Sequence, residues 1–185
     1  MSPAALTRRV FLIGFMGAGK TTVGRALAGR LGWTFRDLDE VIESRQGKSV
    51  AAIFADHGEK GFRKMESAAL QDLLAANSDR QGGGMVVALG GGAFVQPDNR
   101  RALDRAGAVT ILLEAPLEEL RRRCTVEGKV RPLAREDKAF AELFAARQSV
   151  YRLAPQRVET MNKSIDQVAE EIELMLAAQQ QARGR

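Results

Sequence analysis

The sequence is poor in the residues that build disulfides, zinc sites and histidine-based catalytic sites. Its 185 residues include a single cysteine, Cys124, and a single histidine, His57. One cysteine cannot form an internal disulfide, and without a CxxC pair there is no zinc-binding pattern. With one histidine, Ser-His-Asp triads and histidine-rich metal sites are excluded from consideration.

Long apolar runs and aromatic residues are also scarce. No apolar run reaches the roughly 18 residues that span a bilayer. Met1–Arg9 lacks the apolar segment and cleavage site of a secretion signal. With one Trp and one Tyr, the chain lacks the interleaved aromatic and basic residues of single-strand binders. We therefore expect a cytoplasmic protein that binds neither membranes nor nucleic acid.

The rest of the composition is that of an ordinary globular domain. Hydrophobic residues make up 45% and charged residues 28%, and the length suits a single domain over residues 1–185. The net charge is +5 and the pI is about 9.8. A basic surface attracts ATP and nucleic acids alike, or serves no particular partner. Charge alone therefore leaves the ligand open.

Short apolar runs alternate with helical patterns along the chain. The apolar runs predict strands at Val10–Ile13, Trp33–Phe35, Met85–Leu89, Ala108–Leu113 and Arg157–Thr160. Helices are expected around Val23–Leu31, Ser49–Phe54, Phe62–Ala76, Arg100–Arg105, Leu117–Cys124, Lys138–Leu153 and Ser164–Ala178, with a frayed tail over 179–185. The helix ends are marked by Gly32, by Ser49 and by a capping box of Ser164 with Gln167. This alternation predicts a three-layer α/β/α domain around a central five-stranded parallel sheet.

A glycine-rich loop carries the clearest functional pattern. Gly14 to Thr21 reads GFMGAGKT and satisfies G-x-x-x-x-G-K-[ST], between a predicted strand and a predicted helix. The glycines allow successive N–H groups to turn inward as an anion nest at the positive end of the helix. Lys20 would lie against the β- and γ-phosphates, and Thr21 would give its hydroxyl to Mg²⁺. The alternative is a glycine-rich turn that matches by accident.

The loop alone does not separate kinases from GTPases and motors. The sequence has no N-K-x-D motif, and none of its apolar runs ends in a Walker-B aspartate. Asp37 and Asp39 follow a predicted strand, and strand alternation would point them in different directions. One could face the magnesium while the other faces a substrate hydroxyl. Alternatively, Asp39 only caps the helix that follows.

Three further features have both a functional and an ordinary structural interpretation. Gly90–Gly92 follows a strand where a ligand could approach the backbone, or it is a flexible turn. Arg63 and Glu66 lie three residues apart on a predicted helix and could form only a surface ion pair. Arg131 lies in the polar stretch Thr125–Asp137, which could close over phosphates or be a solvated loop.

In this order, the patterns resemble the shikimate kinase family from Val10 to about Ile172. The matching blocks are GFMGAGKTTVGRALAGRLG, the DLD at Asp37–Asp39, IFADHGEKGFRKME, ALGGGA, RPL and the pair Arg147 and Tyr151. The resemblance implies a monomeric kinase that uses ATP and Mg²⁺ to phosphorylate the 3-hydroxyl of shikimate, a step of chorismate and aromatic amino acid biosynthesis. It also implies a P-loop kinase fold with a substrate-binding segment over about 34–66 and a mobile lid over about 125–137.

The resemblance further implies which residues bind the nucleotide and metal. The ATP phosphates would contact Gly17, Ala18, Gly19, Lys20, Thr21 and Thr22. Thr21 would bind Mg²⁺ directly, and Asp37 would reach the metal through water. Arg131 would contact the phosphates from the lid and take part in catalysis together with Lys20. Lys163 falls, more loosely, where the family wraps adenine.

The same resemblance assigns the shikimate site. Asp39 would hold the hydroxyls and either orient the attacking one or accept its proton. Arg63 and Arg147 would grip the carboxylate, although Arg147 taken alone reads as a surface arginine. The pocket would be completed by the backbone of Gly91 and Gly92 and by the side chains of Phe54, Phe62 and Glu66. A carboxylate that bears three hydroxyls calls for planar cations at one end and an acceptor carboxylate at the other.

One departure and several rival functions remain open at this stage. Many family members carry an arginine seven residues before the RPL arginine, where this chain has Cys124 with Arg123 beside it. Whether Arg123 replaces that arginine is not decided by the sequence. The rivals are a gluconate or nucleotide kinase, a regulatory nucleotide-binding module without catalysis, and a nucleic-acid-binding protein supported only by the pI.

Overall fold

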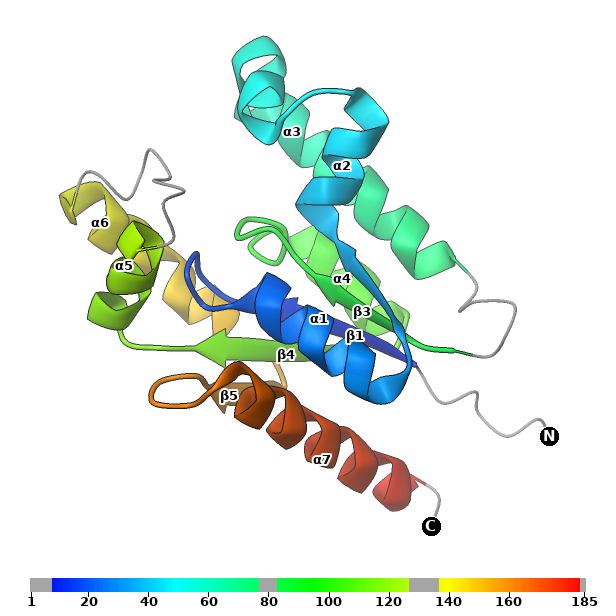
Figure 1. The fold of residues 1–185 in the computed structure, drawn as a ribbon. Coiled ribbons are helices and arrows are strands. Elements are labelled where there is room, and N and C mark those ends of the chain that lie inside the picture. The colour runs from blue at the N-terminus through cyan, green and yellow to red at the C-terminus, as the bar shows by residue number, and fades with distance from the viewer. Residues whose placement is uncertain (1–7, 77–82, 127–136, 184–185) are drawn as a thin grey trace.

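The computed structural model describes residues 8–76, 83–126 and 137–183, and its strands form one sheet (Figure 1). The strands are β1 (Arg9–Ile13), β2 (Thr34–Asp37), β3 (Met85–Ala88), β4 (Val109–Glu114) and β5 (Gln156–Glu159). All neighbouring strands are parallel, in the order β2-β3-β1-β4-β5. The predicted five-stranded parallel sheet is confirmed.

Helices cover both faces of this sheet. They are α1 (Lys20–Leu31), α2 (Leu38–Gln46), α3 (Val50–Ala75), α4 (Pro97–Arg105), α5 (Leu117–Val126), α6 (Asp137–Tyr151) and α7 (Ile165–Arg183). In Figure 1, α1 and α7 lie side by side in front of the sheet, and α4 and α6 lie behind it. Because both faces are covered, the central strands are almost entirely apolar and buried. None of the described helices has the length and apolarity needed to cross a bilayer.

Several helix ends follow local signals in the sequence. Gly32 forms the C-cap of α1 in the left-handed conformation. At the start of α3, the Ser49 hydroxyl accepts a hydrogen bond from the amide of Ala52 at 3.2 Å. Before α7, the Ser164 amide donates to Gln167 Oε1 at 2.8 Å and the Gln167 amide donates to Ser164 Oγ at 3.2 Å. The predicted cap residues are thus confirmed.

Two helix boundaries differ from the prediction. Separate helices were expected over 49–54 and 62–76, and α3 (Val50–Ala75) does consist of two helical segments, but they meet directly at a kink at Gly58 with no longer break between them. The intervening residues include alanine, glutamate and lysine, which favour helix, so the chain resumes the helix after one residue. Helix α7 continues to Arg183, so the predicted frayed tail is wrong for residues 179–183. Glutamine and alanine have a low free-energy cost in a helix, so the helix continues. The apolar pattern of the sequence had indicated only where contacts with the core end.

The carboxyl ends of the parallel strands meet at one edge of the sheet. At this edge β1 leads into the glycine-rich loop, β2 ends at Asp37, and β3 leads into Gly90–Gly92. The central strand β1 pairs with β3 on one side and β4 on the other, so the winding of the chain reverses beside it. Ligands of open α/β sheets bind at such a switch point. The topology therefore brings three of the predicted motifs together.

Candidate active site

The loop between β1 and α1 is held in shape by the helices around it. Gly17 has a φ of 79°, and a Cβ atom there would lie 2.6 Å from the carbonyl oxygen of Leu120 and 3.0 Å from Cys124 Sγ. Helix α5 therefore packs directly on the loop backbone, where only glycine fits. On the other side, the Phe15 ring meets the Phe140 ring of α6 edge-on, with centroids 5.1 Å apart. These contacts make the loop a rigid part of the fold.

The loop and the start of α1 concentrate positive potential. Lys20 Nζ donates hydrogen bonds to the carbonyl oxygens of Gly14 at 2.9 Å and Phe15 at 3.1 Å. The first turn of α1 contains no acidic residue of its own, and the positive end of the helix dipole lies at the loop. An ammonium group beside a helix N-terminus is suited to a polyanion. The geometry required for phosphate binding is present.

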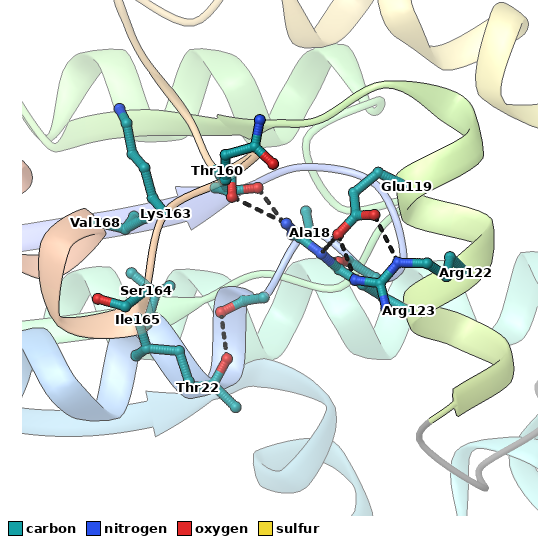
Figure 2. Close-up of a pocket in the computed structure, with 14 residues that line it drawn as sticks. Ala18, Thr22, Glu119, Arg122, Arg123, Thr160, Lys163, Ser164, Ile165 and Val168 are labelled. Carbon is teal, nitrogen blue, oxygen red and sulfur yellow. Dashed lines mark hydrogen bonds and ion pairs between the residues drawn. The ribbon is translucent and has the colours of Figure 1, made fainter.

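A pocket of about 560 Å³ opens beside this loop (Figure 2). Its walls come from the glycine-rich loop, from α5 and from the segment that joins β5 to α7. Predicted nucleotide-binding residues that line it are Gly17, Ala18, Gly19, Thr22 and Lys163. Lys163 lies at the rim and pairs with Glu171 at 2.5 Å. The volume falls in the range of small-molecule sites.

A hydroxyl and a carboxylate meet at the start of α1. Thr21 Oγ1 donates to Asp37 Oδ2 at 2.8 Å. Magnesium takes hard oxygen ligands, and it is usually held by one or two carboxylates together with substrate phosphates. In the part of the chain that the structure describes, there is no cluster of three or more His, Cys, Asp or Glu residues that could hold a metal. The Thr21 and Asp37 pair fits Mg²⁺ bound jointly with a nucleotide.

Asp37 and Asp39 point in different directions as predicted, but for another reason than strand alternation. Asp37 ends β2 and faces Thr21, whereas Asp39 lies in the first turn of α2 and faces Gly90. The capping role belongs to Asp37, whose Oδ1 accepts a hydrogen bond from the Asp39 amide at 3.0 Å. The helix begins at Leu38, directly after this cap, and the Leu38 side chain is fully buried in the core. Asp39 is left to face the neighbouring glycine loop.

Gly90 lies against two carboxylates. A Cβ atom on Gly90 would lie 2.7 Å from Asp39 Oδ1 and 2.9 Å from Glu66 Oε1. These two side chains come from α2 and α3, so the glycine loop joins helices that are separate in the sequence. Any side chain at this position would displace one of the two carboxylates. One end of the site is therefore acidic.

The next two glycines lie against arginines. A Cβ atom on Gly91 would lie 3.0 Å from Arg147 Nη1, and one on Gly92 would overlap the Arg63 guanidinium. The two guanidinium groups reach this loop from α6 and α3. Arg147 is therefore directed at the glycine loop, which its sequence position alone did not indicate. The other end of the site is basic.

Arg63 is held by a buried partner and by two rings. Its Nη1 donates to Glu66 Oε2 at 2.9 Å, and Gln96 Nε2 donates to the same oxygen at 3.1 Å. The stacked rings of Phe54 and Phe62, with centroids 4.5 Å apart, lie below the guanidinium at 5.9 and 5.4 Å. Glu66 is 0% exposed, and this burial raises the pKa of its carboxyl while the Arg63 charge opposes the rise. The pair is not a surface ion pair.

Tyr151 ties α6 to the glycine loop. Its hydroxyl donates a hydrogen bond to the carbonyl oxygen of Gly91, and its side chain is buried. Burial raises the pKa of the Tyr151 phenol, with the Arg147 charge acting in the opposite direction. The neutral phenol is therefore the form that holds Gly91 in place. Helix spacing puts Tyr151 and Arg147 on the same face, one turn apart.

Known proteins share this fold and much of the sequence. The shikimate kinase family model matches residues 16–177. The shikimate kinase of Geobacter metallireducens is 41% identical over 175 residues, which cover 93% of each chain. The chain belongs to the shikimate kinase family. The structure of shikimate kinase from Acinetobacter baumannii in complex with shikimate has a TM-score of 0.82 at 34% identity, covering 92% of this chain and 93% of that one. The shikimate kinase structure from Aquifex aeolicus has a TM-score of 0.79 at 33% identity, covering 92% and 97%.

On α5 the sequence departs from the shikimate kinase pattern, and the structure explains the departure. Cys124, which stands where many shikimate kinases carry arginine, is buried against the backbone of Gly17. Arg123 instead lines the pocket beside the phosphate loop, where it donates hydrogen bonds to Thr160. Arg131 and most of the predicted lid fall outside the described residues.

Two residues that contact the predicted site were given no role in it by the sequence analysis. Gln96 donates to the buried Glu66 carboxylate, and Tyr151 donates to the Gly91 carbonyl. Tyr151 was paired with Arg147 in the sequence pattern, and its position four residues after Arg147 could have indicated that it faces the same site. Nothing in the local sequence around Gln96 signals its contact, which depends on how α3 packs beside α4.

Proposed function

We propose that this member of the shikimate kinase family transfers the γ-phosphoryl group of ATP to the 3-hydroxyl of shikimate, in the synthesis of chorismate and the aromatic amino acids. The observation that carries the proposal is the convergence of Asp39, Arg63 and Arg147 on Gly90–Gly92, at the same sheet edge as the phosphate loop. Such a site is acidic at one end and basic at the other, as a hydroxylated carboxylate requires.

The basic end would hold the shikimate carboxylate. Planar guanidinium groups offer paired donors that match a carboxylate, and Arg63 and Arg147 both face the glycine loop. Glu66 and the rings of Phe54 and Phe62 fix the direction of Arg63. Backbone groups of Gly91 and Gly92 would complete this end of the pocket. The segment over about 34–66 thus contributes most of the substrate contacts.

Asp39 would act on the hydroxyl that attacks. Its carboxylate would accept a hydrogen bond from the 3-hydroxyl and then take its proton as the bond from oxygen to the γ-phosphorus forms. The bond between that phosphorus and the β,γ-bridging oxygen breaks, and ADP leaves. Because phosphoryl transfer is loose, the main tasks of the protein are positioning and charge compensation.

The nucleotide would occupy the pocket beside the phosphate loop. Backbone amides of residues 17–22 and the Lys20 ammonium would hold the phosphates, with Lys163 near the base. Thr21 would bind Mg²⁺ directly and Asp37 through water, and the bound ion would supply positive charge to the β- and γ-phosphates. Arg131, from the predicted lid, would add a further cation. We also propose that the protein works as a cytoplasmic monomer without a nucleic-acid partner.

A coupled ADP-release assay tests the reaction. The purified protein with ATP and Mg²⁺ is offered shikimate, gluconate or a nucleoside monophosphate as acceptor. We expect turnover with shikimate alone, because a nucleoside monophosphate has no carboxylate and the open chain of gluconate does not hold its hydroxyls in a fixed arrangement relative to its carboxylate. Faster turnover with gluconate or a nucleotide would assign the protein to one of the rival kinases. ADP binding without turnover of any acceptor would favour the regulatory module.

A further inference from the structure

Arg123 joins the segments that surround the nucleotide pocket (Figure 2). Its Nη1 donates to Thr160 Oγ1 at 2.9 Å, and its Nη2 donates to the Thr160 carbonyl oxygen at 2.9 Å. Its Nε donates to Glu119 Oε1 at 2.7 Å, and Nη1 also lies 3.5 Å from the carbonyl oxygen of Gly17. One planar side chain therefore contacts α5, the phosphate loop and the first residue after β5.

Thr160 is itself anchored on the other side. Its amide donates to the Glu114 carbonyl oxygen at 2.8 Å, and its hydroxyl donates to the same oxygen at 3.1 Å. The hydroxyl thus accepts from Arg123 and donates to the end of β4, which uses both of its hydrogen-bonding capacities. Thr160 is only 3% exposed. The network runs without a gap from β4 through Thr160 and Arg123 to the phosphate loop.

The contacts of Arg123 leave it little capacity for a phosphate. Its side chain is 21% exposed, and the Glu119 carboxylate compensates its charge. Hydrogen bonds from Arg122 and Arg123 lower the pKa of Glu119 to about 2, so this carboxylate is ionised at neutral pH. Helix periodicity turns Leu120 and Cys124 toward the phosphate loop and leaves Glu119 and Arg123 on the pocket side. The hydrogen bonds of Arg123 therefore link protein segments to one another.

We propose that Arg123 is a positioning residue that sets the width of the nucleotide pocket by holding the segment from Thr160 to Ile165 against the phosphate loop. This segment and the loop both line the same pocket. A rigid wall lowers the ordering cost of nucleotide binding, whereas a loosened wall must be ordered by the nucleotide itself. The inference rests on the proposed function for the identity of the nucleotide.

Calorimetric titration of Mg²⁺ and ADP, without shikimate, tests this positioning role directly. We expect Arg123→Met to weaken ADP binding about tenfold, since the nucleotide must then order a pocket wall that Arg123 no longer holds. The KM for ATP should rise by a similar factor while the KM for shikimate stays within about twofold. Arg101→Met, which removes an exposed arginine of α4 paired with Asp98, is the matched control and should bind ADP as the parent does.

Variants of Thr160 distinguish loss of the contact between Arg123 and Thr160 from a general loss of structure. Thr160→Val keeps the shape of the side chain but lacks the hydroxyl, so it should also weaken ADP binding. Thr160→Ser keeps the hydroxyl and should bind ADP more tightly than Thr160→Val does. Combining Thr160→Val with Arg123→Met should add less than the sum of the single effects, because both remove the same contact. Circular dichroism and melting curves establish that each variant is folded. If Arg123→Met fails to fold, Thr160→Val and Arg123→Lys carry the test.

Two outcomes would overturn the inference. One is parental ADP affinity in folded Arg123→Met or, where that variant does not fold, in Thr160→Val. The other is an equal rise in the KM of both substrates. These outcomes are separable from failure of the proposed reaction. If the parent protein binds ADP but does not phosphorylate shikimate, the proposed reaction is refuted. The ADP titration of the variants still tests the positioning role of Arg123 in that case.

Discussion

The buried carboxylate of Glu66 controls how the Arg63 guanidinium is presented to the site. Its Oε2 accepts hydrogen bonds from Arg63 and Gln96, but its Oε1 has no hydrogen-bond partner among the described residues. Asp39 lies close by, across Gly90, and adds a like charge. A fully buried carboxylate in this setting favours the protonated form more than it does in the unfolded chain.

This gives a pH-dependent stability difference between the protein and Glu66→Gln. The folded pKa of Glu66 is raised above its ordinary value of 4.5, so the folded state binds the proton more tightly than the unfolded state. The resulting stabilisation is complete below the ordinary pKa and is lost as the pH rises through the folded value. We expect the unfolding free energy of the parent, relative to Glu66→Gln, to fall from about pH 4 toward neutral pH in urea titrations. A pH-independent difference would contradict this.

Asp39→Asn tests the catalytic carboxylate. The substitution keeps the size of the side chain and leaves the backbone amide that Asp37 caps. We expect kcat to fall by on the order of 100-fold or more, because an amide cannot accept the proton of the hydroxyl. ADP affinity by calorimetry should be unchanged, since the phosphate loop is untouched. Asp98→Asn, at an exposed position of α4, is the control, and a fully active Asp39→Asn would remove Asp39 from this role.

Arg63→Ala and Arg147→Ala test the carboxylate clamp. Each loses charge-assisted hydrogen bonds to the substrate, so the KM for shikimate should rise about 10- to 100-fold. The KM for ATP should change little, because both arginines face the glycine loop. Steady-state kinetics with each substrate varied in turn measure the two values. Unchanged shikimate affinity in both variants would show that the clamp is wrong.

At the scale of elements, the kink in α3 positions the aromatic side of the site. Gly58 interrupts the helix with φ 62° and ψ 179°, between Phe54 and Phe62. The two phenylalanines stack across this interruption, and Arg63 lies over both rings. A straight helix would place residues eight apart about two turns from one another, too far for the rings to stack. The kink is therefore part of the substrate site.

Gly58→Ala should destabilise the protein by about 1–3 kcal/mol, because this backbone conformation is nearly restricted to glycine. An added Cβ atom would meet no other atom within 4 Å, so the cost is that of the backbone alone. The KM for shikimate should rise as the rings shift. Gly29→Ala is the matched control, because it has equally open space but lies inside α1, and it should stabilise by about 0.5–1 kcal/mol. Urea unfolding of both variants measures the contrast, and equal effects would contradict the role of the kink.

At the scale of the whole molecule, the sheet and its helices share one contiguous apolar core. The walls of the pocket beside the phosphate loop come from segments that follow three different strands, β1, β4 and β5. A ligand in that pocket therefore stabilises the entire fold. We expect one unfolding transition in calorimetry, raised by ADP with Mg²⁺, with a gain of about 2.7 kcal/mol at 100 times the Kd. Two separate transitions, only one of them ligand-dependent, would show that the molecule is not a single cooperative unit.

Local patterns determined much of this protein without any structure. Continuous apolar runs such as Val86–Ala88 predicted buried parallel strands, because both faces of such a strand are covered. The glycine-rich loop before Lys20 predicted a phosphate site, since its glycines can adopt the backbone angles that turn N–H groups toward an anion. Caps such as Ser49 are equally local. The order of the motifs was enough to point to the family.

Only the tertiary structure decided how the charged groups meet. The approach of Asp39, Arg63 and Arg147 to Gly90–Gly92 depends on how three helices pack around one strand end. The hydrogen bonds of Arg123 to Thr160 join residues 37 positions apart. Periodicity indicates which face of a helix is buried, but it carries no information about the partner across the interface. That choice follows from packing of the complete chain.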